Sequence, residues 1–267
     1  AQLPSDMKDC EQQDWARPAL RACSAILQSG ALTRDVEARV RLARGRAWLR
    51  EEEPEEAVTD FTRAIEIEPA NFEALRGRIR AYTVLEKPAL AAKDWSAIIA
   101  LKPEAEENYV ARAAALLAAG DTSAALADFD KAVTLNPKSI PGHIGRGKVF
   151  VALDRRELAL KAFDTAQAID PNNFAPYLAR GEAADKWGDE KAAIAHLKKV
   201  MTSDPPSGAK ITFSAEKASV GWDAPPLADW LGAACADASK AFFGKPCVYM
   251  GEGGTIPFMG MLGAKFP

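Results

Sequence analysis

The stretch from Asp121 to Pro137 decides the fold, and it reads DTSAALADFDKAVTLNP. A polar turn opens it, apolar residues follow at helical spacing, and a proline that cannot continue a helix ends it. The same pattern recurs along the chain, ending at prolines 34 residues apart: Pro69, Pro103, Pro137, Pro171 and Pro205. A period of this length predicts a solenoid of stacked units.

The same residue classes recur inside each unit when its proline is taken as position 32. Position 8 is small in four of the five units, and Ile79 is the exception. Position 20 holds Ala57, Ala91, Ala125, Ala159 and Ala193, and position 24 holds Phe61, Trp95, Phe129, Phe163 and Leu197. This pattern predicts two antiparallel helices per unit, with small residues at their close approach and large residues between units. Gly120 and Gly188 are expected in the turns between the two helices.

These residues resemble the tetratricopeptide repeat in period, in the order of small, aromatic and proline residues, and in the two-helix layout. The resemblance covers five repeats at about residues 38–205. It implies an all-α superhelical solenoid of antiparallel helix pairs that presents a concave surface to a protein or peptide partner. We therefore expect three parts: a degenerate helical repeat or cap at 1–37, five repeats at 38–205, and a tail at 206–267.

Arginine occupies position 7 of every unit, as Arg44, Arg78, Arg112, Arg146 and Arg180. Aspartate occupies position 23 of the first three, as Asp60, Asp94 and Asp128. The arginines either form a ladder for an anionic partner or pair with the aspartates to clamp the two helices together, and the shared register favours the clamp. Position 23 holds Ala162 and His196 in the last two units, which predicts that Arg146 and Arg180 are freer to take another role.

The resemblance implies that positions 2, 5, 9 and 12 of each first helix line the concave face. This face is basic in its N-terminal half, apolar in the middle and acidic at its end. The candidate partner-binding residues are Arg39, Arg46, Arg76, Arg80 and Lys148, which would meet an acidic segment of the partner. The alternative is a solvated inner surface without a dedicated ligand.

Cys10 and Cys23 lie 13 residues apart, at positions 7 and 20 of the register extended backwards. These positions face each other across a helix pair, which favours a disulfide over two free buried thiols. The sequence opens Ala-Gln-Leu-Pro-Ser, as a chain does after removal of a signal peptide, although a shortened chain would begin in the same way. With the cysteine pair, this predicts a periplasmic or otherwise exported protein.

The tail carries the distinctive motif Glu-Gly-Gly-Thr-Ile-Pro at 252–257. It resembles a late segment of the M20 family of zinc peptidases, in the carnosinase-like branch. The resemblance implies a short strand, helix and strand before a loop in which Gly254, Thr255 and Ile256 contact the substrate. The family's zinc ligands and catalytic base are missing from the tail, and both histidines of the chain lie inside repeats. We therefore expect no catalysis, metal or cofactor, and interpret the tail as a cap, a fused peptidase piece or a ligand of the groove.

Composition excludes two further classes. The 267 residues include 34 basic and 37 acidic side chains, and a net charge of −3 argues against nucleic-acid binding through bulk positive charge. No apolar run approaches the ~18–20 residues of a membrane span. The leading prediction is a non-catalytic interaction scaffold that binds a protein or peptide in its concave groove. The alternative is a component or remnant of an M20-type zinc metallopeptidase, and such a peptidase is also a candidate partner.

Overall fold

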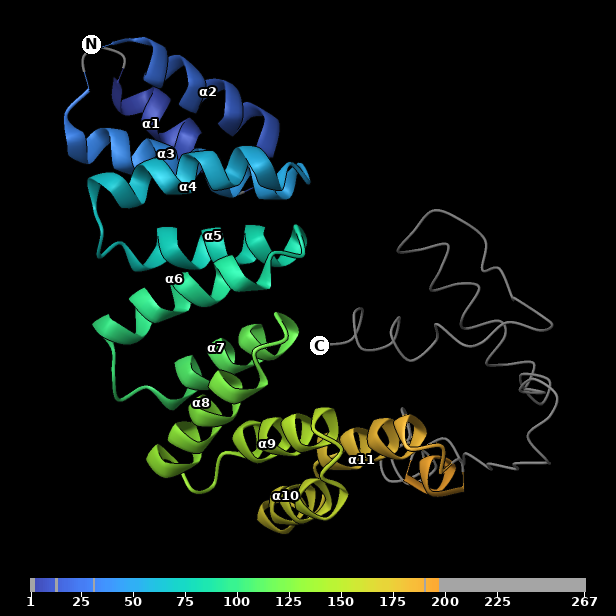
Figure 1. Cartoon of the computed structure of the whole chain (residues 1–267). Coiled ribbons are helices and arrows are strands. Elements are labelled where there is room, and N and C mark those ends of the chain that lie inside the picture. The colour runs from blue at the N-terminus through green and yellow to red at the C-terminus, as the bar shows by residue number, and fades with distance from the viewer. Residues whose placement is uncertain (1–2, 13, 31, 190, 197–267) are drawn as a thin grey trace, which may run out of the picture. The chain divides into compact units, whose positions relative to one another are not determined.

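The computed structural model describes residues 3–12, 14–30, 32–189 and 191–196 (Figure 1). The chain divides into two units, 1–210 and 211–267, and the described residues all belong to the first. The predicted strand–helix–strand tail at 206–267 therefore lies outside the described residues. None of the described helices combines the length and the apolar character needed to span a membrane.

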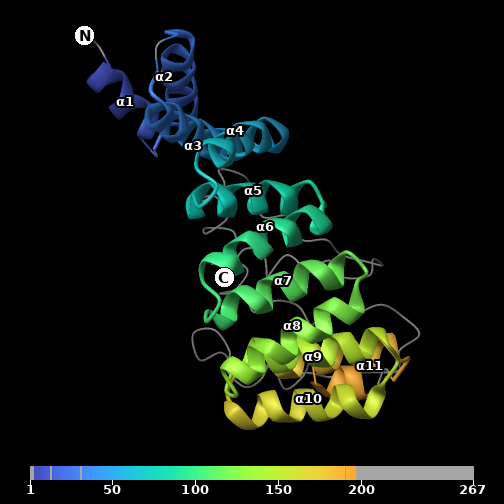
Figure 2. The ribbon, with the colours of Figure 1, turned by 60° about the vertical axis from the view of Figure 1, so that its left-hand side comes forward.

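The described part is all-helical, as predicted. Its helices are α1 (Leu3–Glu11), α2 (Ala16–Gln28), α3 (Arg34–Arg50), α4 (Pro54–Ile67), α5 (Phe72–Val84), α6 (Pro88–Leu101), α7 (Glu106–Ala118), α8 (Thr122–Leu135), α9 (Ile140–Ala152), α10 (Arg156–Ile169) and α11 (Ala175–Lys186). Each helix packs against the next, and the pairs stack in chain order, as Figures 1 and 2 show. The first helices of the units are α3, α5, α7, α9 and α11, and the second helices are α4, α6, α8 and α10.

Several helices begin where the sequence supplies a cap or a proline. Pro54 and Pro88 occupy the first turns of α4 and α6, where the missing N–H of proline costs no hydrogen bond. The side chains of Asn71, Asp121 and Ser139 accept hydrogen bonds from the first turns of α5, α8 and α9. The starts of these five helices are therefore set by the local sequence, whereas α7 and α10 begin without a side-chain cap.

The turns between paired helices share one backbone feature. Gly120 and Gly188 have φ of +87° and +72°, which confirms the turns expected there. Glu52, Glu86 and Asp154 occupy the equivalent turns with φ of +63°, +53° and +53°. These three side chains hold a left-handed conformation that favours glycine, so three of the five turns are strained.

The core is built where aromatic rings meet small residues. A Cβ added to Gly45 would lie 2.7 Å from the ring of Phe61, and one added to Gly77 would lie 2.5 Å from it. Phe61 is fully buried, so it fills the space between α4 and both neighbouring first helices. Phe129 approaches Gly145 and Phe163 approaches Gly147 in the same way. The ring at position 24 therefore packs against small residues at two places: position 8 of its own unit, as predicted, and position 6 of the next unit.

One place in the stack departs from this rule. The backbones of α3 and α5, of α7 and α9, and of α9 and α11 come within 8 Å of each other, but among the described helices α5 and α7 do not. Here Ile79 occupies position 8 and Trp95 occupies position 24, whereas the α3–α5 contact has Gly45 and Phe61. We attribute the separation to these larger side chains, because two helices cannot approach closely across them. We call the space between these two helices the α5–α7 interval.

Position 6 of the following unit does not explain the separation. It holds Ala111 at the α5–α7 interval, in place of Gly77 at the α3–α5 contact. Ala179 occupies the same position in α11, and α9 and α11 still approach closely. A single methyl group at position 6 is therefore compatible with close approach, and the difference lies at positions 8 and 24.

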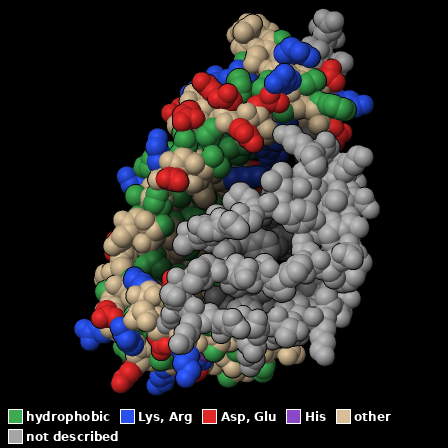
Figure 3. Space-filling model, turned by 90° about the vertical axis from the view of Figure 1, so that its right-hand side faces the viewer, with side chains coloured by type: hydrophobic (Ala, Val, Ile, Leu, Met, Phe, Trp, Pro, Cys, Tyr) green, Lys and Arg blue, Asp and Glu red, His purple; other side chains and the backbone are tan. Residues whose placement is uncertain are grey.

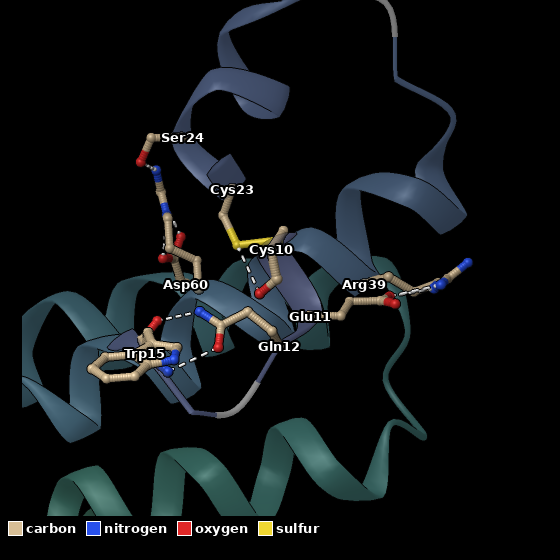
Figure 4. Close-up of a disulfide and its surroundings, with 9 residues drawn as sticks. Cys10, Glu11, Gln12, Trp15, Cys23, Ser24, Arg39 and Asp60 are labelled. Atoms are coloured by element: carbon tan, nitrogen blue, oxygen red, sulfur yellow. Dashed lines mark hydrogen bonds and ion pairs between the residues drawn. A yellow bond between two sulfur atoms is a disulfide. The ribbon is translucent and has the colours of Figure 1, made fainter. Parts of the chain in front are cut away.

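The N-terminal helices form a stapled unit. Cys10 and Cys23 form a disulfide between α1 and α2, which confirms the predicted pair (Figure 4). Both cysteines are buried in a cluster with Ile26 and with Val40 and Ala43 of α3. The disulfide therefore ties α1 to α2 at the place where this unit packs on the solenoid.

Candidate protein-binding groove

The position-7 arginines of the first three repeats form clamps, as the shared register predicts. Two guanidinium nitrogens of Arg44 donate to Asp60 at 2.7 and 2.8 Å. The matching pairs, Arg78 with Asp94 and Arg112 with Asp128, have the same two-pronged geometry at 2.6–2.8 Å. The three aspartate side chains are at most 9% exposed. These arginines join the two helices of a unit and are not available to a ligand.

The surroundings of Arg78 and Arg112 raise the pKa of both guanidinium groups. Burial opposes the charge of Arg78, but the hydrogen bonds to Asp94 and the attraction of that carboxylate outweigh it, so its pKa is raised. The hydrogen bonds to Asp128 likewise raise the pKa of Arg112. Both arginines therefore remain charged throughout the physiological pH range.

The prediction that Arg146 and Arg180 are freer to take another role is wrong, because both have an acid partner. Nε of Arg146 lies 2.7 Å from Oδ1 of Asp130, and Arg180 forms an ion pair with Asp164. Both acids occupy position 25 of the preceding unit, on its second helix. In the earlier repeats Thr62 and Ser96 hold this position and accept hydrogen bonds from Arg78 and Arg112.

Arg78 and Arg112 therefore each contact two successive second helices, whereas Arg146 and Arg180 contact the second helix of the preceding unit. The acid is on its own unit in the second and third repeats and on the preceding unit in the fourth and fifth. Position 23 does not reveal the acid partners of Arg146 and Arg180, because these acids belong to the preceding repeat.

Three of the five predicted partner-binding residues already have an acid partner. Arg39 Nη2 lies 2.6 Å from Glu11 of α1, as Figure 4 shows, and Arg46 Nη2 lies 2.6 Å from Glu73 of α5. Lys148 Nζ lies 3.0 Å from Glu182 of α11. These side chains are between 40% and 62% exposed, so each pair stabilises the fold by about 1 kcal/mol or less. A ligand carboxylate would have to compete with them.

Arg76 and Arg80 differ from those three residues. Both are exposed on one face of α5, and neither forms an ion pair with any residue that the structure describes. The guanidinium of Arg76 lies 5.7 Å from the centre of the Phe72 ring, and Nζ of Lys102 lies 4.5 Å from it. Phe72 therefore gathers two cations at the start of α5, and Arg80 adds a third charge one turn further along the helix.

The repeat register provides a direct comparison for Arg80. Arg46 and Glu73 are 27 residues apart and form an ion pair between α3 and α5. Glu107 stands at the same register from Arg80, but within the described residues these two form no ion pair. The difference follows from the α5–α7 interval, because α3 and α5 approach closely and α5 and α7 do not.

An apolar hollow of about 570 Å³ lies next to this interval, between α7, α9 and α11. Val110 and Ala114 of α7, Pro141 and Ile144 of α9, and Ala175 of α11 form its apolar wall. At its rim, the carboxylate of Glu106 accepts hydrogen bonds from Asn136 at 3.0 Å and Ser139 at 2.9 Å. Lys138 and Lys148 complete the rim.

The remaining predicted residues have simpler outcomes. Gly254, Thr255 and Ile256 lie outside the described residues. Nε2 of His143 contacts the carbonyl of Pro137 at 2.9 Å, at the position where the Tyr109 hydroxyl contacts Pro103 in the repeat before, so His143 has a structural contact. In the described ranges no group of three or more His, Cys, Asp or Glu could hold a metal ion.

Lys, Arg, Asp and Glu are interspersed on the face shown in Figure 3.

The fold and the groove define an α-solenoid built from stacked helix pairs. Three family models described as tetratricopeptide repeat match residues 42–106, 116–183 and 175–207. The chain therefore contains tetratricopeptide repeats, as the 34-residue period predicts. These matches end at residue 207, and the resemblance of the tail to M20 peptidases stays a prediction.

Solved structures share this fold. A tetratricopeptide repeat protein from Parabacteroides merdae is 21% identical, with a TM-score of 0.63 over 72% of this chain and 74% of that chain. The MamA protein is 18% identical, with a TM-score of 0.52 over 62% of this chain and 91% of that chain. At these identities the likeness shows the fold alone. A search of the curated proteins found no match to the sequence.

Proposed function

We propose that this protein is an interaction scaffold that holds a segment of a protein partner in the groove lined by α5, α7, α9 and α11. One observation carries the proposal: α5 bears two exposed arginines without acid partners in the described part of the chain, and the next first helix, α7, lines an apolar hollow. Exposed like charges four residues apart on a helix destabilise it, so their presence favours a role outside the fold. An acidic segment would neutralise them.

The proposal assigns unequal roles to the five predicted residues. Arg76 and Arg80 would contact the ligand carboxylates directly. Arg39, Arg46 and Lys148 would contribute only by exchanging Glu11, Glu73 and Glu182 for ligand groups, which returns little free energy. A buried apolar side chain contributes about 1.5–3 kcal/mol, so the hollow supplies a large part of the affinity. The scaffold has no catalytic step of its own in this proposal.

The disulfide supports a proposed location in an oxidising compartment, either periplasmic or otherwise exported. Disulfides persist in such compartments, whereas cytosolic reductants keep most thiols reduced. Alkylation of thiols in cells before lysis would test this. We expect Cys10 and Cys23 to stay unmodified until a reductant is added, and their modification without a reductant would contradict the proposal.

The groove is tested by selecting ligands from a displayed library of random peptides and mapping them by amide chemical shifts of the full chain. We expect the shifts to change on α5, α7 and α9. Charge reversal of Arg76 and Arg80 together should weaken binding at least tenfold, while the matched control Arg155→Glu, at an exposed position before α10, should not change it. Shift changes confined to α4, α6, α8 and α10, with unchanged affinity of the double variant, would contradict the proposal.

A further inference from the structure

The groove has two exposed arginines at the α5–α7 interval and an apolar hollow between α7, α9 and α11. We propose that carboxylates of an extended, acidic partner segment bind Arg76 and Arg80 at the α5–α7 interval. A bulky apolar side chain of the same segment, about four to five residues away, enters the hollow between α7, α9 and α11. This inference rests on the proposed function and specifies the chemistry of the ligand.

The α5–α7 interval is a place where the described part of the protein leaves a groove arginine unpaired. Between α3 and α5 the groove is closed by its own ion pair, Arg46 with Glu73 at 2.6 Å. Between α5 and α7 the equivalent residues, Arg80 and Glu107, are both exposed and form no such pair in the described structure. A ligand carboxylate at this interval therefore gains an arginine without displacing a protein acid.

Arg76 is held by an aromatic ring of its own helix. Its guanidinium lies over Phe72, whose ring also carries Nζ of Lys102 at 4.5 Å from its centre. A cation over an aromatic face is restricted in position but keeps its N–H donors for another partner. Arg76 is therefore oriented for a carboxylate before the ligand arrives.

The hollow between α7, α9 and α11 is suited to an apolar group. Its wall consists mainly of apolar side chains, with Val110 and Ile144 half-buried and Pro141 exposed. Ligand pockets typically enclose about 300–1,000 Å³, so a hollow of about 570 Å³ is sufficient for one bulky apolar side chain. The positive site and the apolar site therefore select different groups of one ligand.

The spacing follows from the helix stack. Packed neighbouring helices such as α7 and α9 are about 8–10 Å apart, and α5 and α7 are further apart than that, so the middle of the hollow, halfway between α7 and α9, lies about 15 Å from the face of α5. An extended chain covers about 3.3 Å per residue, which gives about four to five residues between the acid and the anchor. A helical ligand rises only about 1.5 Å per residue and would need about ten.

Glu107 provides an independent check. It stands at the register position opposite Arg80 and repels an incoming carboxylate without being paired to Arg80 itself. Glu107→Gln should therefore strengthen the binding of an acidic peptide by about two- to fivefold. Glu55→Gln, an exposed acid on α4, is the matched control and should leave the affinity unchanged.

The test measures fluorescence anisotropy of the full chain with labelled synthetic peptides. Each peptide carries an Asp-Asp-Glu triplet, a Gly-Ser spacer of two, four or eight residues, and one Phe, and control peptides replace Phe by Ala or the triplet by Asn-Asn-Gln. We expect the four-residue spacer to bind about tenfold tighter than the others. Arg80→Glu should weaken all acidic peptides at least tenfold, and Ile144→Asp should abolish the advantage of Phe over Ala.

The outcomes separate this inference from the proposed function. Loss of binding in Ile144→Asp but not in Arg80→Glu or Arg80→Gln overturns the acid site and leaves the groove in place. An optimum at the longest spacer overturns the extended form. Weakening in none of the three variants, each with an unchanged melting temperature, overturns both proposals. No binding of any peptide overturns this inference, while the displayed library still tests the groove.

Discussion

Two places in the same stack have the same repeat register and opposite properties. At the α3–α5 contact, Phe61 sits between Gly45 and Gly77, the helices approach closely, and Arg46 pairs with Glu73. At the α5–α7 interval, Ile79 and Trp95 replace the glycine and the phenylalanine, and Arg80 remains without an acid among the described residues. The size of the packed side chains therefore decides whether the groove closes on itself or leaves charge for a ligand.

The largest expected effect is the loss of the buried acid that clamps α3 to α4 in the first repeat. Asp60 is 1% exposed and accepts hydrogen bonds from both Arg41 and Arg44. Asp60→Asn should lower the free energy of unfolding by about 3 kcal/mol, because it removes the counter-charge of the partly buried Arg44 and one of the two acids beside Arg41. Urea denaturation measures this.

The matched control is Asp164→Asn, since Asp164 pairs with Arg180 but is 61% exposed. Its cost should stay below about 1 kcal/mol. Equal costs for the two variants would show that burial does not set the strength of these clamps.

The next largest effect is expected from enlarging Gly77 at the α3–α5 contact. A Cβ at Gly77 would lie 2.5 Å from Cζ of Phe61, which is fully buried and has no room to move. Gly77→Ala should therefore destabilise the protein by about 1–2 kcal/mol, although alanine normally stabilises a helix relative to glycine. Thermal unfolding gives the value.

The control is the same substitution in a Phe61→Leu background, where the smaller side chain relieves the contact. There the penalty should shrink or change sign. A penalty that is unchanged by Phe61→Leu would place the cause elsewhere than in this contact.

Stability and peptide affinity should respond independently when the second repeat is stabilised at a turn outside the groove. Glu86 has φ of +53° in the turn between α5 and α6. Glu86→Gly should raise the free energy of unfolding by about 0.5–1 kcal/mol, because the relief of left-handed strain exceeds the entropic cost of glycine.

Gly120→Ala, at the equivalent turn of the next repeat, should lower the stability by about 1 kcal/mol. Peptide affinity should be unaffected by either variant. Destabilisation by Glu86→Gly would refute the account of these turns.

The smallest expected effect is a dependence on pH within the first repeat. The hydrogen bonds from Arg63, 2.8 Å from Oε1, lower the pKa of Glu37. A lowered pKa in the folded state contributes stability above the ordinary value of about 4.3, and this contribution disappears as the pH falls below that value. Glu37→Gln should therefore flatten the fall in urea midpoint between about pH 5 and pH 3, and an unchanged slope would contradict this.

The sequence allowed the helix pairs to be predicted because their signals lie within one repeat. The period, the alanines at position 20 and the aromatic residues at position 24 specify two packed helices, and the backward register locates Cys10 and Cys23. Contacts between repeats were harder to predict. The acids Asp130 and Asp164 pair with arginines of the following repeat, and Gly77 accommodates a ring of the preceding one. Comparing equivalent positions down the repeats does not show which positions of different repeats meet.

The candidate site was predicted in the same partial way. The repeat register placed the five basic residues on one face, but their availability to a ligand depends on neighbours from other repeats. Only the structure shows that three of the five basic residues already form ion pairs, with Glu11, Glu73 and Glu182. The α5–α7 interval depends on the combined volume of Ile79 and Trp95, which lie on different helices, and residue class alone does not convey that volume.

The most direct measurement compares the affinity of one acidic peptide, with the four-residue spacer, for Arg80→Glu and for Arg46→Glu. Both variants reverse one groove arginine at position 9 of neighbouring repeats and change the net charge equally. The account predicts at least a tenfold loss for Arg80→Glu and less than a threefold loss for Arg46→Glu, because Arg46 is already paired with Glu73. Equal losses, or a larger loss for Arg46→Glu, would contradict it.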